Sequence, residues 1–169
     1  MKKTLLYIFI IIFLTACANK NNVTKNNLNN NSKKLYNLII KSSEYIDKNE
    51  ASDFSTNIIL HSVFLAKSYK VNTHPLIHNT LINLNLKQKG FCYHYANDLL
   101  KYINYKKYKS FKFKKIVSNR NNYFEHTAII LTRKDINFEN SIVLDAWRDA
   151  GKLYFSKIKD DKKYKWELK

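Results

Sequence analysis

His126-Thr-Ala-Ile-Ile-Leu-Thr132 and Ser141-Ile-Val-Leu-Asp-Ala-Trp147 are the two stretches that decide the fold class of this chain. Both are short, apolar and rich in β-branched residues, which is typical of strands that are buried in a sheet. The alternating run Phe111-Lys-Phe-Lys114 lies before them, and Leu153-Tyr-Phe155 follows Gly151. These two segments predict further strands, so the second half of the chain predicts a sheet.

The residues before Tyr108 show helical periodicity instead, with apolar residues three, four or seven positions apart. We expect the second helix to begin at Ser52 or Asp53 and the third at Thr73, since each of these residues is a good N-cap. Because the helices precede the strands, the sequence predicts an α+β fold with an antiparallel sheet. The four expected helices cover residues 35–48, 52–69, 73–84 and 92–104.

The N-terminus has the pattern of an export signal. Lys2 and Lys3 precede an uncharged apolar run from Leu5 to Phe13, which is much shorter than the roughly 20 residues that span a bilayer. The next four residues, Leu14-Thr-Ala-Cys17, resemble the lipobox of bacterial lipoproteins. This resemblance implies a signal peptide over 1–16 and a mature chain that begins at Cys17 with acyl groups such as palmitate. Asp is absent after the cysteine, which favours the outer membrane, facing the periplasm.

The remaining chain divides into two parts. Residues 17–34 are rich in Asn and Lys and poor in large apolar side chains, so we expect a flexible tether there. Residues 35–169 have the length of one domain with its own core, and we expect a monomer.

The net charge of +17 has two interpretations. The lysines are scattered along the chain, which favours a compositional bias over a dedicated binding face. The alternative is contact with an anionic surface of the cell envelope. Nucleic acid is not an expected partner of an exported protein.

Cys92 is the first candidate for chemistry, because the chain has only two cysteines and lipid on Cys17 would leave Cys92 unpaired. Cys92 follows Gly90 and begins an expected helix. Free N–H groups and the helix dipole at that position favour a thiolate, and the same N–H groups can bind an oxyanion. The alternative is a small buried hydrophobic residue.

His126 and Asp145 are the candidates for the base and for the group that orients it. His126 opens an apolar strand, and Asp145 lies within another, where an unpaired carboxylate is costly. If the two strands are neighbours, Asp145 can bind one ring nitrogen while the other faces Cys92. The alternatives are a structural histidine and a carboxylate paired with Arg148.

Three segments carry a resemblance to the transglutaminase-like superfamily of papain-like thiol enzymes, and to small bacterial lipoproteins of that type. They are Lys89-Gly-Phe-Cys-Tyr-His-Tyr-Ala-Asn-Asp-Leu99, Glu125-His-Thr-Ala128 and Val143-Leu-Asp-Ala-Trp-Arg-Asp-Ala-Gly-Lys-Leu-Tyr154. The resemblance implies a helix that delivers Cys92 onto a sheet carrying His126 and Asp145, as nucleophile, base and orienting residue. It also implies acyl transfer or amide hydrolysis through a thioester. The papain-type glutamine before the nucleophile is missing, because Gln88 is only four residues upstream.

Other residues carry weaker predictions. Tyr93, His94 and Trp147 are candidates for substrate contacts, although aromatic residues near such a helix are more often structural. His74 and His78 have the i, i+4 spacing of a metal pair, but no third ligand accompanies them. We therefore expect neither a metal nor a cofactor.

Two main functions follow from these residues. The first is an envelope thiol enzyme that acts on a protein or peptide substrate. The second is a binding or scaffold lipoprotein that keeps the fold without catalysis. A structural lipoprotein in which the three residues meet by coincidence is a third, simpler interpretation.

Overall fold

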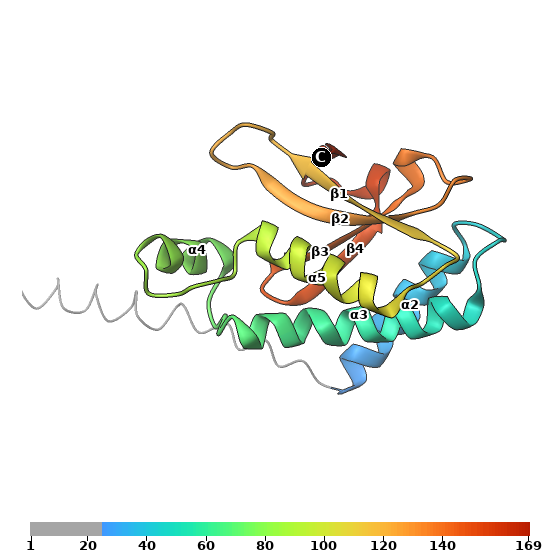
Figure 1. Ribbon diagram of the computed structural model, residues 1–169, viewed down its shortest axis with the longest axis horizontal. Helices are drawn as coiled ribbons and strands as arrows, with labels where there is room; N and C mark the ends of the chain where they lie inside the picture. Colours follow the sequence, from blue (N-terminus) through green and yellow to red (C-terminus); the bar gives the residue numbers. More distant parts are fainter. Residues whose placement is uncertain (1–24) are drawn as a thin grey trace, which may run out of the picture.

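The computed structural model describes residues 25–169 and has an α+β architecture (Figure 1). The expected signal peptide, Cys17 and the first residues of the expected tether lie outside the described residues. The helices are α2 (Lys25–Ile40), α3 (Lys48–Ser68), α4 (Pro75–Asn83) and α5 (Cys92–Lys106). The strands are β1 (Lys112–Ser118), β2 (His126–Thr132), β3 (Ile142–Asp149), β4 (Lys152–Lys157) and β5 (Glu167–Leu168), with short 3-10 helices at Phe138–Asn140 and Ile158–Asp160.

The strands form one antiparallel sheet in the order β4-β3-β2-β1-β5. The predicted α+β class and the four predicted strands are confirmed, and β2 has the bounds of the stretch quoted first. The sequence did not predict β5, because two exposed residues, Glu167 and Leu168, carry no alternation that distinguishes a strand from a loop.

Both faces of the central strands are buried, which explains their continuous apolar sequence. Side chains alternate between the two faces of a strand, so Ile129 and Leu131 join the core shared with the helices. Ala128 and Ile130 belong to a second apolar cluster, on the opposite face, that includes Trp166 near the C-terminus. The sheet therefore lies between the helices and the C-terminal segment.

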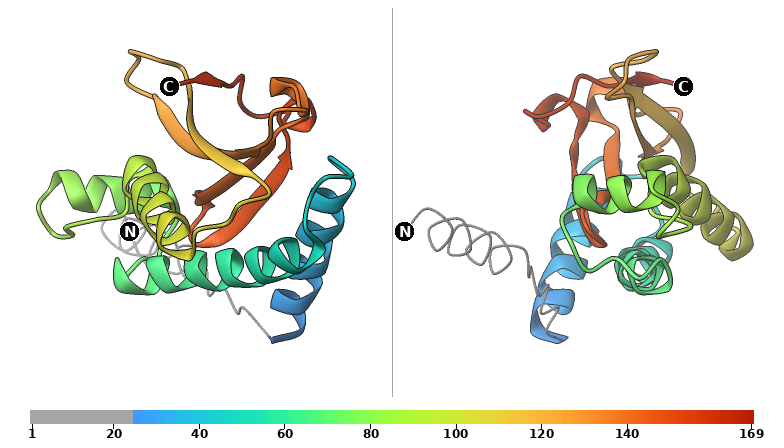
Figure 2. Two further views of the ribbon diagram at one scale, coloured as in Figure 1. Left: turned by 45° about the vertical axis from the view of Figure 1, so that its right-hand side comes forward. Right: turned by 90° about the vertical axis from the view of Figure 1, so that its left-hand side faces the viewer.

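Helix α5 packs against β2 and β3, and α3 lies beneath α5 and reaches β4 (Figures 1 and 2). Helix α2 pairs with α3 away from the centre of the sheet. The buried stripe of α5 consists of Tyr95, Ala96, Leu99 and Ile103, at the helical spacing from which the sequence predicted this helix. This packing places the N-terminus of α5 at one end of β2.

Two of the helix starts predicted from the sequence were wrong. Helix α3 begins at Lys48, and Asp47 rather than Ser52 or Asp53 accepts the N–H of Glu50 at 2.7 Å. Helix α4 is capped by His74 instead of Thr73, since His74 Nδ1 accepts the N–H of Leu76 at 3.3 Å. Several good caps compete within a few residues of each start, and tertiary packing decides among them.

Helix α2 also differs from the expected helix over residues 35–48. It begins at Lys25, within the expected tether, and ends at Ile40. Leu28 packs against the same core as Leu35 and Ile39, so one apolar stripe continues through a segment whose Asn-rich composition masked it. None of the helices in residues 25–169 has both the length and the apolar character that a bilayer-spanning helix requires.

Candidate active site

Cys92 is the first residue of α5, where the N–H groups have no acceptor within the helix. The chain enters the helix through Gly90, whose φ of +136° is accessible to glycine but rarely to other residues. A Cβ atom on Gly90 would lie 2.4 Å from the ring of His78. Glycine is therefore required both by backbone conformation and by space, and it allows the Cys92 side chain to remain only half-buried.

His94 fixes this turn from the first turn of the helix. Its Nδ1 accepts hydrogen bonds from the N–H groups of Gly90 and Phe91, each at 3.2 Å. Burial and the positive charge of Lys89 lower the pKa of His94, although Asp98 opposes them. A neutral ring keeps the lone pair that these two N–H groups need.

His126, at the start of β2, and Asp145, in β3, point to the same face of the sheet and are hydrogen-bonded. His126 Nε2 lies 2.7 Å from Asp145 Oδ2, and the two residues are 3% and 1% exposed. Burial raises the pKa of Asp145, but His126 and Arg148 outweigh burial and hold this pKa below its ordinary value. An ionised carboxylate only accepts hydrogen bonds, so Nε2 carries the hydrogen, and in a neutral ring Nδ1 has the free lone pair.

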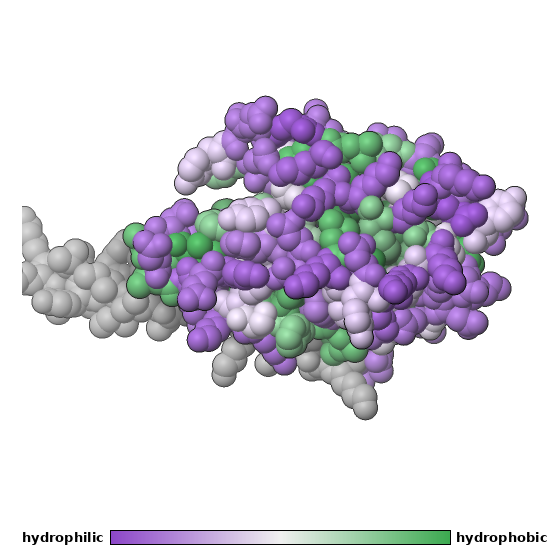
Figure 3. Space-filling view, viewed as in Figure 1, coloured by the Kyte–Doolittle hydropathy of each residue, from purple (hydrophilic) through white to green (hydrophobic). Residues whose placement is uncertain are grey.

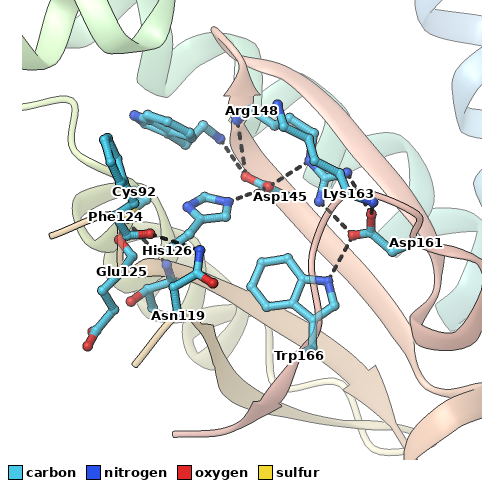
Figure 4. Close-up of polar contacts among 12 residues, drawn as sticks. Cys92, Asn119, Phe124, Glu125, His126, Asp145, Arg148, Asp161, Lys163 and Trp166 are labelled. Carbon is cyan, nitrogen blue, oxygen red and sulfur yellow. Dashed lines mark hydrogen bonds and ion pairs between the residues drawn. The ribbon is translucent and has the colours of Figure 1, made fainter. Parts of the chain in front are cut away.

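The Cys92 side chain lies on the other side of the His126 ring from Asp145 (Figure 4). Its sulfur accepts the N–H of Thr127 at 3.5 Å, and it lies 3.9 Å from the carbonyl oxygen of Glu125, to which the thiol can donate. Nδ1 of His126 is buried and has no hydrogen-bond partner within residues 25–169, which leaves it available to the thiol. The three residues selected from the sequence therefore lie side by side.

Arg148 links the Asp145 carboxylate to Asp161 behind the site. Its Nε donates to Asp145 at 3.0 Å, and its two terminal nitrogens donate to the Asp161 oxygens at 3.1 and 2.7 Å. The guanidinium also lies over the rings of Tyr154 and Tyr164. Burial opposes its charge, but the two carboxylates raise the pKa of Arg148. Asp145 thus has both partners that the sequence left open, the histidine and the arginine.

Aromatic rings surround His126 and exclude water from it. The ring centroids of Tyr164, Trp147 and Trp166 lie 4.5, 4.9 and 5.4 Å from that of His126. Burial lowers the pKa of His126, but the charge and hydrogen bond of Asp145, with a smaller contribution from Cys92, raise it to about 9. The ring is therefore an imidazolium at neutral pH, and an adjacent imidazolium favours a thiolate.

A pocket of about 600 Å³ opens onto Cys92 and His126. Its volume is within the range of ligand-binding pockets in proteins. One wall is α4, with Asn79 and Asn83, and another is the loop from β1 to β2, with Tyr123. Figure 3 shows the molecule hollowed between this loop and α4. The half-buried Cys92 side chain can therefore be reached from this pocket, and the almost fully buried His126 ring borders it.

The three weaker candidates occupy different positions around this pocket. Tyr93 and Trp147 line it, whereas His94 does not. Tyr93 is 46% exposed at the rim, and Trp147 contacts the His126 ring from within. Their contacts with substrate stay predictions, and the contacts of His94 are those of a residue that holds the turn.

Several residues of the site were not predicted from the sequence. Asp161 accepts the Trp166 indole N–H at 2.8 Å, and this bond holds the C-terminal segment against His126. Asn79 accepts the indole N–H of Trp147 at 3.3 Å. These residues lie far from Cys92 in the sequence, and the only signal for Asp161 was a carboxylate in a lysine-rich segment, which is too weak to identify a site.

The described residues contain no group of three or more His, Cys, Asp or Glu side chains arranged to hold a metal ion. Of the two histidines with metal-pair spacing, His74 caps α4, while His78 is buried with Nε2 2.9 Å from the Lys89 carbonyl oxygen. One nitrogen of each ring therefore holds the backbone on either side of α4, and within residues 25–169 His78 Nδ1 has no hydrogen-bond partner.

Comparison of the chain with protein-family models, with curated proteins and with solved structures gives no match. The function is therefore argued from the geometry of this site and from the sequence alone.

Proposed function

We propose that the chain is an envelope lipoprotein with cysteine chemistry of the transglutaminase-like type, acting on an amide through a thioester at Cys92. The single observation that carries this proposal is the arrangement around His126, which has Asp145 on Nε2 and Cys92 beside the ring. The finer fold, a papain-like thiol domain, is part of the same proposal. It is supported by a helix N-terminus that meets a sheet at this point.

The proposed reaction follows from the charges of the three residues. His126 as an imidazolium stabilises the Cys92 thiolate, which adds to the carbonyl carbon of an amide. The imidazolium then gives its proton to the leaving nitrogen, and a thioester on Cys92 results. Water releases an acid from the thioester, whereas an amine releases a new amide. Asp145 holds the tautomer and stabilises the imidazolium throughout.

A protein or peptide substrate in the cell envelope fits the pocket. Tyr123 and Phe124, which line it, are 90% and 68% exposed, and Leu76 on the α4 side is 51% exposed. Exposed apolar side chains at a rim commonly mark a surface that binds a partner. Lipid on Cys17 would restrict this chemistry to molecules near the membrane.

Alkylation of Cys92 tests the proposal. In the full chain with Cys17→Ser, kept in detergent, Cys92 is the only thiol. We expect iodoacetamide to modify it readily at pH 6 to 7, because the imidazolium favours the thiolate. His126→Ala should slow this reaction about tenfold or more at the same pH. Equal rates in the two proteins would contradict the proposal.

A binding lipoprotein without catalysis is the second candidate, favoured by the same exposed rim. Complementation of a deletion strain separates the two functions. Cys92→Ser should fail to complement if the chain is an enzyme, and should complement fully if the chain only binds a partner. Tyr123→Ser is the matched variant, because it changes the exposed rim of the pocket and leaves Cys92 in place.

A further inference from the structure

The amide of Asn79 has a fixed orientation on the α4 side of the pocket. The indole nitrogen of Trp147 can only donate a hydrogen bond, and it donates to Asn79 Oδ1 at 3.3 Å. The oxygen of the amide therefore faces Trp147, and the NH2 group is directed elsewhere. Within the part of the chain that the structure describes, no side chain or carbonyl accepts a hydrogen bond from this NH2 group, and Asn79 lines the pocket.

This free donor shares a pocket with the proposed chemistry. Trp147, which orients Asn79, packs against the ring of His126 at 4.9 Å between centroids. Asn79 and Cys92 line the same pocket. The N–H of Cys92 is a second donor there, since it belongs to the first turn of α5 and has no acceptor within the helix. Two donors of this kind are what a developing oxyanion requires.

We propose that the Asn79 side chain donates a hydrogen bond to the oxyanion of the tetrahedral intermediate at Cys92; this inference rests on the proposed function. When the thiolate adds to the carbonyl carbon, a carbon–sulfur bond forms and the π electron pair moves to oxygen. Asn79 Nδ2 and the Cys92 N–H stabilise that charge. The electron pair then returns, the carbon–nitrogen bond breaks, and the amine leaves with the proton from His126.

Gln88, the glutamine four residues before Cys92, does not fill this role. It is exposed and does not line the pocket beside Cys92. Asn79 reaches the pocket from α4 instead, thirteen positions before the nucleophile by residue number. The donor therefore belongs to a separate helix and is held by the residue that packs on the base.

Two reactions of the same sulfur test the role of Asn79. Iodoacetamide is attacked at a tetrahedral carbon and releases iodide, so no oxyanion forms. p-Nitrophenyl acetate is attacked at a carbonyl, passes through an oxyanion and releases p-nitrophenolate. In the full chain with Cys17→Ser, we expect Asn79→Ala to slow acylation about 100-fold and to change alkylation by less than about twofold.

Asn104→Ala is the matched control, because Asn104 is an exposed asparagine of α5 that does not line this pocket. It should leave both rates unchanged. Asn79→Asp keeps an oxygen for the Trp147 indole but loses the donor, so it should slow acylation as strongly as Asn79→Ala. If Asn79→Asp acylates at the wild-type rate, Asn79 only anchors Trp147 and the inference is wrong.

The results of these experiments distinguish a failure of this inference from a failure of the proposed function. If wild type acylates and Asn79→Ala acylates equally fast, or if Asn79→Ala slows alkylation by the same factor, only the role of Asn79 is overturned. If the wild-type sulfur is not acylated and its alkylation does not depend on His126, the proposed function and this inference are both wrong.

Discussion

Asp145 and Glu50 are carboxylates with similar hydrogen bonding in two very different regions. Each accepts four hydrogen bonds. The donors to Asp145 are His126, Arg148 and the backbone of residues 147 and 148, at 2.7 to 3.1 Å. The donors to Glu50 are Lys109 and Ser110, at 2.7 to 3.0 Å.

The two regions differ in burial and in the charges of the donors. Asp145 is 1% exposed, and two of its donors are the side chains of an imidazolium and a guanidinium. Glu50 lies near the surface, and its donors are neutral groups that join the start of α3 to the segment before β1. The same number of bonds therefore holds the His126 ring and Arg148 in one region and joins two chain segments in the other.

The largest expected effect is that of Asp145→Ala. It leaves the His126 Nε2 and one Arg148 nitrogen buried without an acceptor, and removing one partner of a buried charged group typically costs about 3–5 kcal/mol. We expect that loss in the free energy of unfolding, measured by urea denaturation. Asp145→Asn is the control, because asparagine has nearly the shape of aspartate but carries no charge. A loss no larger than that of Glu50→Ala would remove the distinction between the two regions.

The pH dependence of stability is the next effect in size. The folded-state pKa of His126 is about 9, above the value of 6.5 for a free side chain. Its contribution to stability is therefore complete below about pH 6.5 and is lost as the pH rises to about 9. We expect this loss to be of the order of 3 kcal/mol. His126→Gln should flatten the curve over this range, and stability that rises with pH in the wild type would contradict the assignment.

The smallest effect is expected at Glu50. Partial burial raises its pKa, but the hydrogen bonds from Ser110 and Lys109 outweigh burial and lower it. Glu50→Ala removes these bonds at a site that water reaches, so we expect a loss of about 1–2 kcal/mol. The alkylation rate of Cys92 should stay the same. A slower alkylation would show that the start of α3 is coupled to the candidate active site.

Much of the site was visible in the sequence because its residues interrupt regular patterns. Asp145 is a charge within an apolar strand, and Cys92 is an unpaired thiol beside one of only two glycines. Each is costly unless its surroundings compensate, so each pointed to a partner. Their distances from His126 were not predictable, because these depend on how β2 and β3 pair and on where α5 crosses them.

The residues whose roles could not be predicted from the sequence have ordinary local surroundings. Asn79 lies among polar residues of a short helix, and Asp161 lies in a lysine-rich segment, where a carboxylate is unremarkable. Asp47 was not predicted as the N-cap of α3, because Ser52 and Asp53 fit the same preference for Ser or Asp at that position. In each case the role depends on a contact with a residue distant in the sequence or on packing between elements.

The sequence by itself determined the class of the fold, the bounds of the central strand β2 and the start of α5, because periodicity and turn residues act over a few positions. It also selected Cys92, His126 and Asp145. Only the tertiary structure decided that Asp145 serves His126 and Arg148 together, and that Trp147 orients Asn79 beside the pocket. Hydrogen bonds across a sheet and between helices depend on positions in space, which local patterns do not specify.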